Sequence, residues 1–115
     1  MQGRLYTSFF EYIKIHFLSK KNNLPILSSS NLEHITLTNK YVFFVKNYVI
    51  AIPECSKFTH PAGNTCLRLH HLQECSYDYN FHSNKAKNMW NEFCVGLAYK
   101  KDLEKYIKQP YGRHY

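Results

Sequence analysis

The chain reads Ile35-Thr-Leu-Thr38, Tyr41-Val-Phe-Phe-Val45 and Tyr48-Val-Ile-Ala-Ile52, three short runs rich in β-branched and aromatic residues. Only two residues separate each run from the next, and such short connections are typical of antiparallel hairpins. The stretch 35–52 therefore predicts a three-stranded antiparallel meander. Neither connection contains the glycine that tight hairpin turns prefer, so the sequence specifies the strand register only weakly.

Just before the meander, Ser30 and Glu33 match the spacing of a helix-capping box. The residues that follow them are β-branched, and such residues favour a strand over a helix. We therefore expect residues 35–38 to be extended, as the first strand of the meander.

A helix is predicted over residues 5–20, before the meander. It begins with the capping pattern formed by Ser8 and Glu11, and its apolar residues recur at helical spacing. These apolar residues are Phe9, Phe10, Ile13 and Phe17. Because they form a wide stripe, we expect the helix to pack on the sheet with this side.

A second helix is predicted over residues 85–109, after the meander, either as one helix or as two short ones. Gly96 marks the expected bend, because glycine costs about 1 kcal/mol relative to alanine inside a helix. Pro110 follows the expected end. The fold class is thus α+β, with an N-terminal helix, a short three-stranded antiparallel meander and a C-terminal helix.

The length of 115 residues suits one domain, 1–115. Polar, proline-containing stretches predict loops at 20–31 and 53–83, with room for a short helix over 66–75, and a frayed tail at 111–115. Aromatic residues make up 17% of the chain, while small residues are scarce. Because stiff rings need matched cavities to pack densely, incomplete folding is one outcome that this composition predicts.

The formal net charge of +7 predicts weak, salt-sensitive attraction to nucleic acid or to an anionic surface. Most of the cationic residues are lysines, which lack the planar fork that recognises bases and phosphates bidentately. A specific polyanion site is therefore not indicated.

No stretch of the sequence predicts a transmembrane segment or a signal peptide. Charged residues interrupt the apolar run near the N-terminus, and the run 41–52 is too short to span a bilayer. The ten asparagines form no glycosylation sequon. We therefore expect an intracellular location, where the four cysteines remain free thiols.

Potential zinc ligands are concentrated between residues 55 and 82. They are Cys55, His60, Cys66, His70, His71, Cys75 and His82. The spacing of His60, Cys66 and His70 resembles the last three ligands of CCCH zinc fingers. That family has Cys where this chain has His60, and its first ligand lies further upstream than Cys55. Because no Cys-x2-Cys pair is present, we expect no bound metal, with zinc in the 55–82 loop as the alternative.

The same region allows one catalytic interpretation. Cys66, with His70 or His71, and Asp78 are the residue types of a nucleophilic triad, but no flanking signature accompanies them. The chain also lacks a P-loop, a dinucleotide-binding glycine motif and a His-Glu-x-x-His motif. We therefore expect no enzyme activity, no catalytic residue and no cofactor.

Three hypotheses about function follow. Residues encoded by AT-rich codons greatly outnumber those encoded by GC-rich codons, which favours the product of an open reading frame without a defined molecular activity. The first alternative is a small basic binding module for nucleic acid or a protein partner, acting through the lysine-rich C-terminal helix with Lys100, Lys101, Lys105 and Lys108. The second alternative is a membrane-peripheral protein that binds through the amphipathic helix 5–20.

Overall fold

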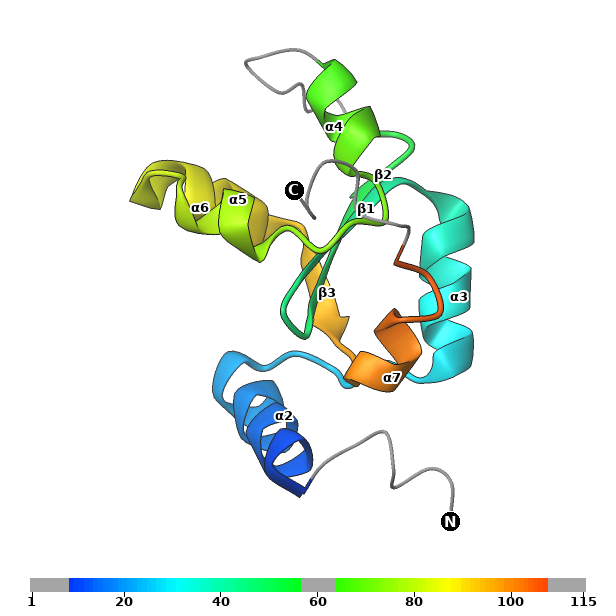
Figure 1. Ribbon diagram of the computed structural model, residues 1–115, viewed down its shortest axis with the longest axis vertical. Coiled ribbons are helices and arrows are strands. Elements are labelled where there is room, and N and C mark those ends of the chain that lie inside the picture. The colour runs from blue at the N-terminus through cyan, green and yellow to red at the C-terminus, as the bar shows by residue number, and fades with distance from the viewer. Residues whose placement is uncertain (1–8, 57–63, 108–115) are drawn as a thin grey trace, which may run out of the picture.

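The computed structural model describes residues 9–56 and 64–107 (Figure 1). The fold is α+β, with helices around a three-stranded antiparallel sheet of order β1-β2-β3. The strands are β1 (Asn39–Val45), β2 (Tyr48–Pro53) and β3 (Cys94–Leu97). The helices are α2 (Phe9–Asn22), α3 (Ser29–Thr38), α4 (Asn64–His70), α5 (Ser76–Asn80), α6 (Asn84–Glu92) and α7 (Lys100–Leu103).

The hairpin of β1 and β2 forms where the sequence predicts it. Val45 pairs with Tyr48 across the two-residue turn, and the register runs on to Asn39 opposite Pro53 with one irregularity near Lys40. Lys46 takes the positive φ of 55° that this turn requires. Its N–H donates to the Glu74 carboxylate at 2.8 Å, so a residue 28 positions away fixes the turn in the absence of glycine.

The prediction of a strand over residues 35–38 is wrong, because these residues end helix α3. The capping box that starts α3 is formed by Ser28 and Asn31, two residues before the pair that the sequence indicates. Leu32, on this helix, is fully buried in the core. The local cap and the burial of Leu32 together outweigh the strand preference of the β-branched residues.

The third strand comes instead from the region predicted as the C-terminal helix. Its described part contains the short helices α6 and α7, which confirms the option of two short helices and not that of one continuous helix. The sequence did not predict the strand β3 between them. Gly96 lies within β3 rather than at a helix bend. The regions 20–31 and 53–83, predicted as loops, contain the end of α2, the start of α3, and helices α4 and α5. The predicted frayed tail 111–115 lies outside the described residues.

Segments outside the three strands border the sheet on both sides. Beside β1, the N–H of Leu72 donates to the Val42 carbonyl at 2.6 Å and the N–H of Phe44 to the Gln73 carbonyl at 3.0 Å. Beside β3, Leu27 N–H donates to the Leu97 carbonyl at 2.7 Å, and Leu97 N–H to the Pro25 carbonyl at 2.9 Å. Residues 71–75 and 25–27 therefore satisfy the outward backbone groups of Val42 and Phe44 on β1 and of Leu97 on β3.

Both faces of the sheet are buried, which explains the unbroken apolar run of β1. Val42 and Phe44 point to one face, where they pack with Leu32 of α3 and Leu103 of α7. Phe43 and Val45 point to the other face. There they pack with Leu67, with Cys75, with Tyr79 of α5 and Trp90 of α6, and with Phe93, which directly follows α6. Figure 1 accordingly shows α3 and α7 on one side of the sheet and α5 and α6 on the other.

Helix α2 lies beside the end of the sheet near β3 and α7 (Figure 1). Its buried residue is Ile15, whereas Phe9, Phe10, Ile13 and Phe17 are exposed. The prediction that this apolar stripe packs on the sheet is therefore wrong. The expected capping residue Ser8 lies outside the described residues. Among those residues, no helix has the length and apolar character needed to cross a membrane.

Candidate functional site

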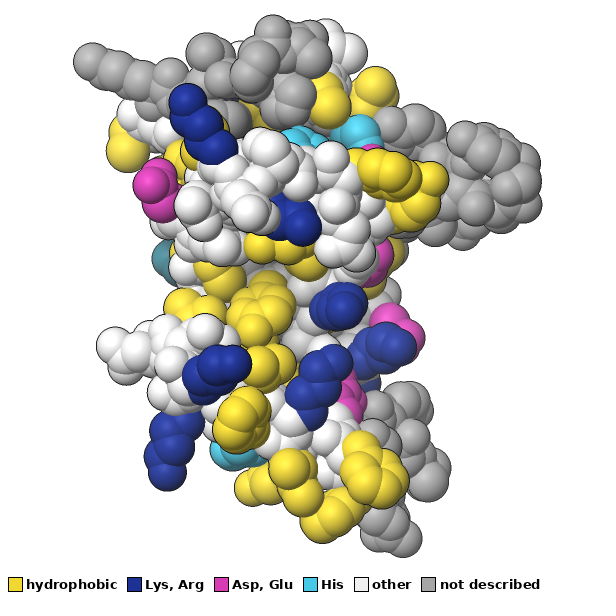
Figure 2. Space-filling model, turned by 90° about the vertical axis from the view of Figure 1, so that its left-hand side faces the viewer, with side chains coloured by type: hydrophobic (Ala, Val, Ile, Leu, Met, Phe, Trp, Pro, Cys, Tyr) yellow, Lys and Arg dark blue, Asp and Glu magenta, His cyan; other side chains and the backbone are white. Residues whose placement is uncertain are grey.

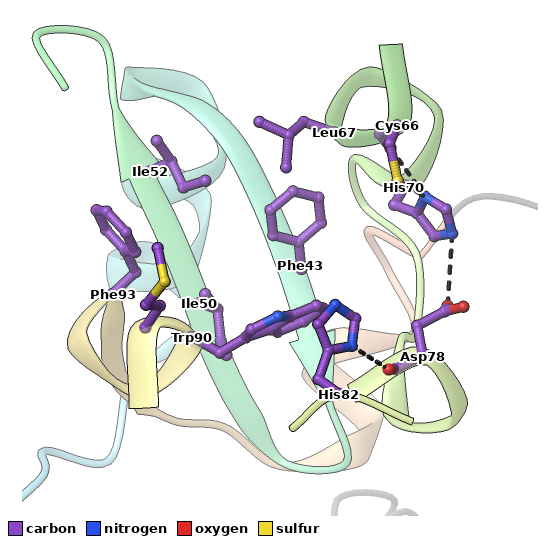
Figure 3. Close-up of a pocket in the computed structure, with 11 residues that line it drawn as sticks. Phe43, Ile50, Ile52, Cys66, Leu67, His70, Asp78, His82, Trp90 and Phe93 are labelled. Carbon is purple, nitrogen blue, oxygen red and sulfur yellow. Dashed lines mark hydrogen bonds and ion pairs between the residues drawn. The ribbon is translucent and has the colours of Figure 1, made fainter. Parts of the chain in front are cut away.

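A pocket of about 190 Å³ opens between the sheet and helices α4, α5 and α6 (Figure 3). Two regions of the chain form its walls: the hairpin of β1 and β2, and the region from residue 66 to residue 93. The lining residues are Phe43, Ile50, Ile52, Cys66, Leu67, His70, Asp78, His82, Met89, Trp90 and Phe93.

The apolar side of the pocket is built by the sheet and by α6. Phe43 and Ile50 come from the sheet face opposite α3 and are almost fully buried. Trp90 of α6 packs against Phe43 with ring centroids 5.9 Å apart. The rings of Tyr79 and Trp90 pack edge-on, with centroids 5.5 Å apart, and this contact supports the indole over the sheet. Packing of these rings on each other fixes the shape of this wall.

The polar side of the pocket is built by α4 and α5 and the residues just after α5 (Figure 3). His70 Nε2 lies 3.4 Å from the Asp78 carboxylate, and the two side chains are about a quarter and two fifths exposed. His82 Nδ1 lies 2.6 Å from the Asp78 backbone carbonyl. Since a carbonyl only accepts hydrogen bonds, His82 Nδ1 carries the proton, and in the neutral ring Nε2 is the acceptor. Asp78 and His82 thus give this side of the pocket hydrogen-bond acceptors.

Cys66 and His70 lie one helical turn apart on α4, with the thiol sulfur 3.8 Å from His70 Nδ1. That nitrogen lies 2.8 Å from the Cys66 carbonyl oxygen, to which it donates its proton. It is therefore not free to accept the thiol proton. Burial, with a smaller effect of the Asp78 charge, raises the pKa of the Cys66 thiol. A nucleophilic cysteine needs a lowered pKa, so this arrangement favours the neutral thiol.

The structure brings together the three residues considered for a triad, with His70 as the histidine, but not the whole set of predicted zinc ligands. Cys66, His70 and Asp78 share the polar side of the pocket, whereas Cys55 is exposed in the turn after β2. His60 lies outside the described residues. Within residues 9–56 and 64–107, no three His, Cys, Asp or Glu side chains form a group that could hold a metal ion.

The two other candidates have structural contacts elsewhere. His71 Nδ1 accepts a hydrogen bond from the N–H of Val42 at 2.9 Å, beside the sheet edge. Cys75 is fully buried, and its thiol donates to the Gln73 carbonyl. Of the two histidines considered for a triad, His70 is therefore the one that faces Asp78.

Sequence reasoning missed the apolar half of the pocket. Phe43 and Trp90 are 47 positions apart, and no short motif links them. Trp90 of α6 and Phe93, which directly follows the helix, keep helical spacing, and this spacing is the available signal for a buried wall. Searches against protein families, curated proteins and solved structures find no match to this chain.

Proposed function

We propose that this chain is a small protein-binding module whose pocket seats one aromatic side chain of a partner. The single observation that carries the proposal is the pocket itself, apolar on one side and lined by acceptors on the other. A well-formed apolar pocket with a few convergent polar groups is the usual form of a binding site. Buried aromatic anchors of this kind contribute most of the binding energy at protein interfaces.

The size of the pocket supports a side chain rather than a whole metabolite. Pockets that enclose drug-sized ligands measure roughly 300–1,000 Å³, whereas an apolar cavity of about 150 Å³ is enough for benzene. At about 190 Å³, the pocket matches a single ring with one small substituent. The rest of the partner would lie outside, on the surface around α4 and α5.

The polar side supports an aromatic group that carries a donor. The Asp78 carboxylate and the acceptor nitrogen of His82 lack a proton to offer, so a phenol O–H or an indole N–H complements them. Tyrosine and tryptophan are the side chains that combine a ring with such a donor. We therefore expect tyrosine or tryptophan, rather than phenylalanine, as the anchor.

The lysine-rich C-terminal helix gives less support to a nucleic-acid partner. Lys100 and Lys101 lie in the four-residue helix α7, and Lys108 lies outside the described residues. Lys105 lies 4.0 Å from the Asp102 carboxylate and 3.4 Å from the Ser29 hydroxyl. Among the described residues, Lys100, Lys101 and Lys105 therefore do not lie on a single helix, because α7 ends at Leu103.

The proposal can be tested through Trp90, the one tryptophan of the chain, which lines the pocket. Its fluorescence, excited at the long-wavelength edge, is followed during titration with p-cresol and with toluene, which differ by a hydroxyl group. We expect saturable binding of p-cresol at about millimolar concentration, because so small a ligand gains little contact. Toluene should bind about fivefold more weakly, since one hydrogen bond contributes roughly 1 kcal/mol.

A matched pair of variants assigns the binding to the pocket. His82→Phe keeps a ring but removes one of the two acceptors, so it should reduce the preference for p-cresol over toluene. His34→Phe changes an exposed histidine on α3 and should leave both titrations unchanged. Absence of saturable binding by the folded protein would contradict the proposal and agree with a product that has no defined activity. Equal loss of binding in both variants would also contradict it.

A further inference from the structure

Helix α2 carries five of the ten large hydrophobic side chains that are exposed among the described residues. We define the α2 aromatic face as Phe9, Phe10, Ile13 and Phe17, whose side chains are 50–81% exposed. They lie on one side of the helix, since their positions follow helical spacing. Figure 2 shows hydrophobic side chains with lysines around them at the end of the molecule where α2 lies. Exposed apolar patches of this kind mark interaction surfaces.

The opposite side of α2 holds the helix in place. Ile15 is fully buried, and the Glu11 carboxylate accepts from the side-chain amide of Asn47 at 2.9 Å and from the N–H of Lys100 at 2.8 Å. His16 contacts the Tyr99 hydroxyl at 3.1 Å. The orientation of α2 is thus fixed by specific polar contacts that turn its aromatic side outward.

The charges on α2 are divided in the same way. Glu11 is the one acidic residue of the helix, and it is on the inward side. Lys14, Lys20 and Lys21 are exposed, and the Lys21 ammonium lies 5.9 Å from the centre of the Phe17 ring. The surface presented outward by α2 therefore combines aromatic rings with positive charge and carries no carboxylate from this helix.

From this combination we infer that the α2 aromatic face docks the protein on the surface of an anionic lipid membrane. A helix that binds at the membrane interface lies in the plane of the bilayer, with its apolar side chains inserted among the acyl chains and its lysines at the headgroups. Lysines close to the membrane surface are attracted to the negative surface potential of anionic lipids. Phenyl rings and lysines on one exposed side of α2 meet both requirements.

Charge also argues against a second copy of this chain as the occupant. In a symmetric dimer the same patch lies on both subunits, so the lysines of one α2 would face those of the other. Like charges in that position cost stability, because no carboxylate of α2 is available to neutralise them. An anionic bilayer offers the complementary charge.

The docking surface is separate from the pocket, since none of the residues that line the pocket belongs to α2. The test therefore uses the whole chain and does not depend on the proposed function. Flotation measures binding to vesicles of phosphatidylcholine alone and of phosphatidylcholine with phosphatidylserine. We expect the protein to float with the anionic vesicles only, and binding to weaken as salt is raised, because salt screens the charge.

Two pairs of variants separate the contributions of the rings and of the charges. Phe10→Ser with Phe17→Ser should weaken vesicle binding about tenfold or more, while Leu37→Ser with Phe81→Ser, two equally exposed positions elsewhere, should not change it. Replacing Lys14, Lys20 and Lys21 by Gln should weaken binding about fivefold for each lysine. Replacing Lys40, Lys85 and Lys87 by Gln is the matched control, which should reduce binding much less.

Three results would overturn the inference. The first is vesicle binding that is unchanged in the double phenylalanine variant. The second is concentration-dependent self-association that the same variant abolishes, without vesicle binding by the original chain, which would identify a second copy as the occupant. The third is binding to nucleic acid that depends on the three lysines but not on the rings, with no retention on vesicles.

Discussion

Cys94 shows how the sheet acts on a single titratable group. The residue lies on β3, and its thiol donates to the Gly96 carbonyl at 3.8 Å. Burial raises the pKa of this thiol, because the low-polarity surroundings disfavour the thiolate. Tyr48, on the neighbouring strand β2, also has a pKa raised by burial, and a Cys94 thiolate would raise it further.

The first prediction concerns stability at alkaline pH. Because the pKa of Cys94 is higher in the folded state, its stabilising contribution is fully present below the ordinary thiol pKa of about 8.5 and is lost as pH rises through the folded-state value. Thermal melts between neutral and alkaline pH should show this decline. Cys94→Ser should make the decline shallower, whereas Cys55→Ser, at an exposed thiol, should leave it unchanged. Identical profiles for the two variants would contradict the assignment to Cys94.

At the scale of elements, β3 depends on a glycine for its contact with segment 25–27, which connects α2 to α3. A Cβ atom added at Gly96 would lie 2.8 Å from the Pro25 carbonyl oxygen and 2.9 Å from Leu27 Cγ. Both distances are shorter than normal contacts, and the first partner is a backbone atom that cannot rotate away. Gly96 is therefore needed because segment 25–27 approaches β3 closely.

The second prediction is that Gly96→Ala destabilises the protein by about 1–3 kcal/mol, the usual cost of overpacking a buried site. Urea unfolding measures this loss. Hydrogen exchange locates it: the Leu27 amide, which donates to Leu97, should exchange faster in the variant. The Leu72 amide at the opposite sheet edge serves as an internal control, and equal acceleration at both amides would argue against a local effect.

The elements also show which signals the sequence contains. The runs 41–45 and 48–52 are correctly predicted as strands, because aromatic and β-branched residues there are buried on both faces of the sheet. The run 35–38 is also rich in β-branched residues, but it follows a helix cap, and its Ile35 packs against the core cluster that contains Leu32. The strand Cys94–Leu97 has four residues and no local signature, since its pairing with Tyr48 comes from distant sequence.

On the scale of the whole molecule, the charge is spread over a small body. The chain has fifteen Lys and Arg and eight Asp and Glu, so positive charges outnumber negative charges by seven. The radius of gyration is 14.2 Å. The screening length is about 30 Å at 0.01 M salt and about 8 Å at 0.15 M, so repulsion acts across the entire molecule only at low salt.

The third prediction is that salt stabilises the fold. Between about 0.01 M and 0.15 M sodium chloride, the melting temperature should rise by roughly a few degrees, because screening relieves the repulsion among lysines. Sodium fluoride should give the same rise if screening, rather than chloride binding, is the cause. A melting temperature that falls with salt would show that attractive charge pairs dominate instead.

The candidate site illustrates why whole-molecule features escape sequence reasoning. Cys66, His70 and Asp78 can be singled out because they lie within 13 positions of one another and carry reactive groups. The apolar residues around them cannot be predicted in the same way, because the apolar wall depends on the contact between Phe43 and Trp90, which are distant in the sequence. The exposure of Phe10 and Phe17 was equally out of reach, since it depends on Glu11 binding Asn47 and Lys100.

The segments that border β1 and β3 have a consequence for the behaviour of many copies in solution. Strands as apolar as Tyr-Val-Phe-Phe-Val and Tyr-Val-Ile-Ala-Ile are templates for cross-β assembly when an edge is open. In the folded chain, residues 71–75 and 25–27 already occupy the hydrogen-bonding positions of Val42, Phe44 and Leu97, which an incoming molecule would otherwise use. Fibril formation should therefore begin with the detachment of one of these two segments, before the sheet itself comes apart.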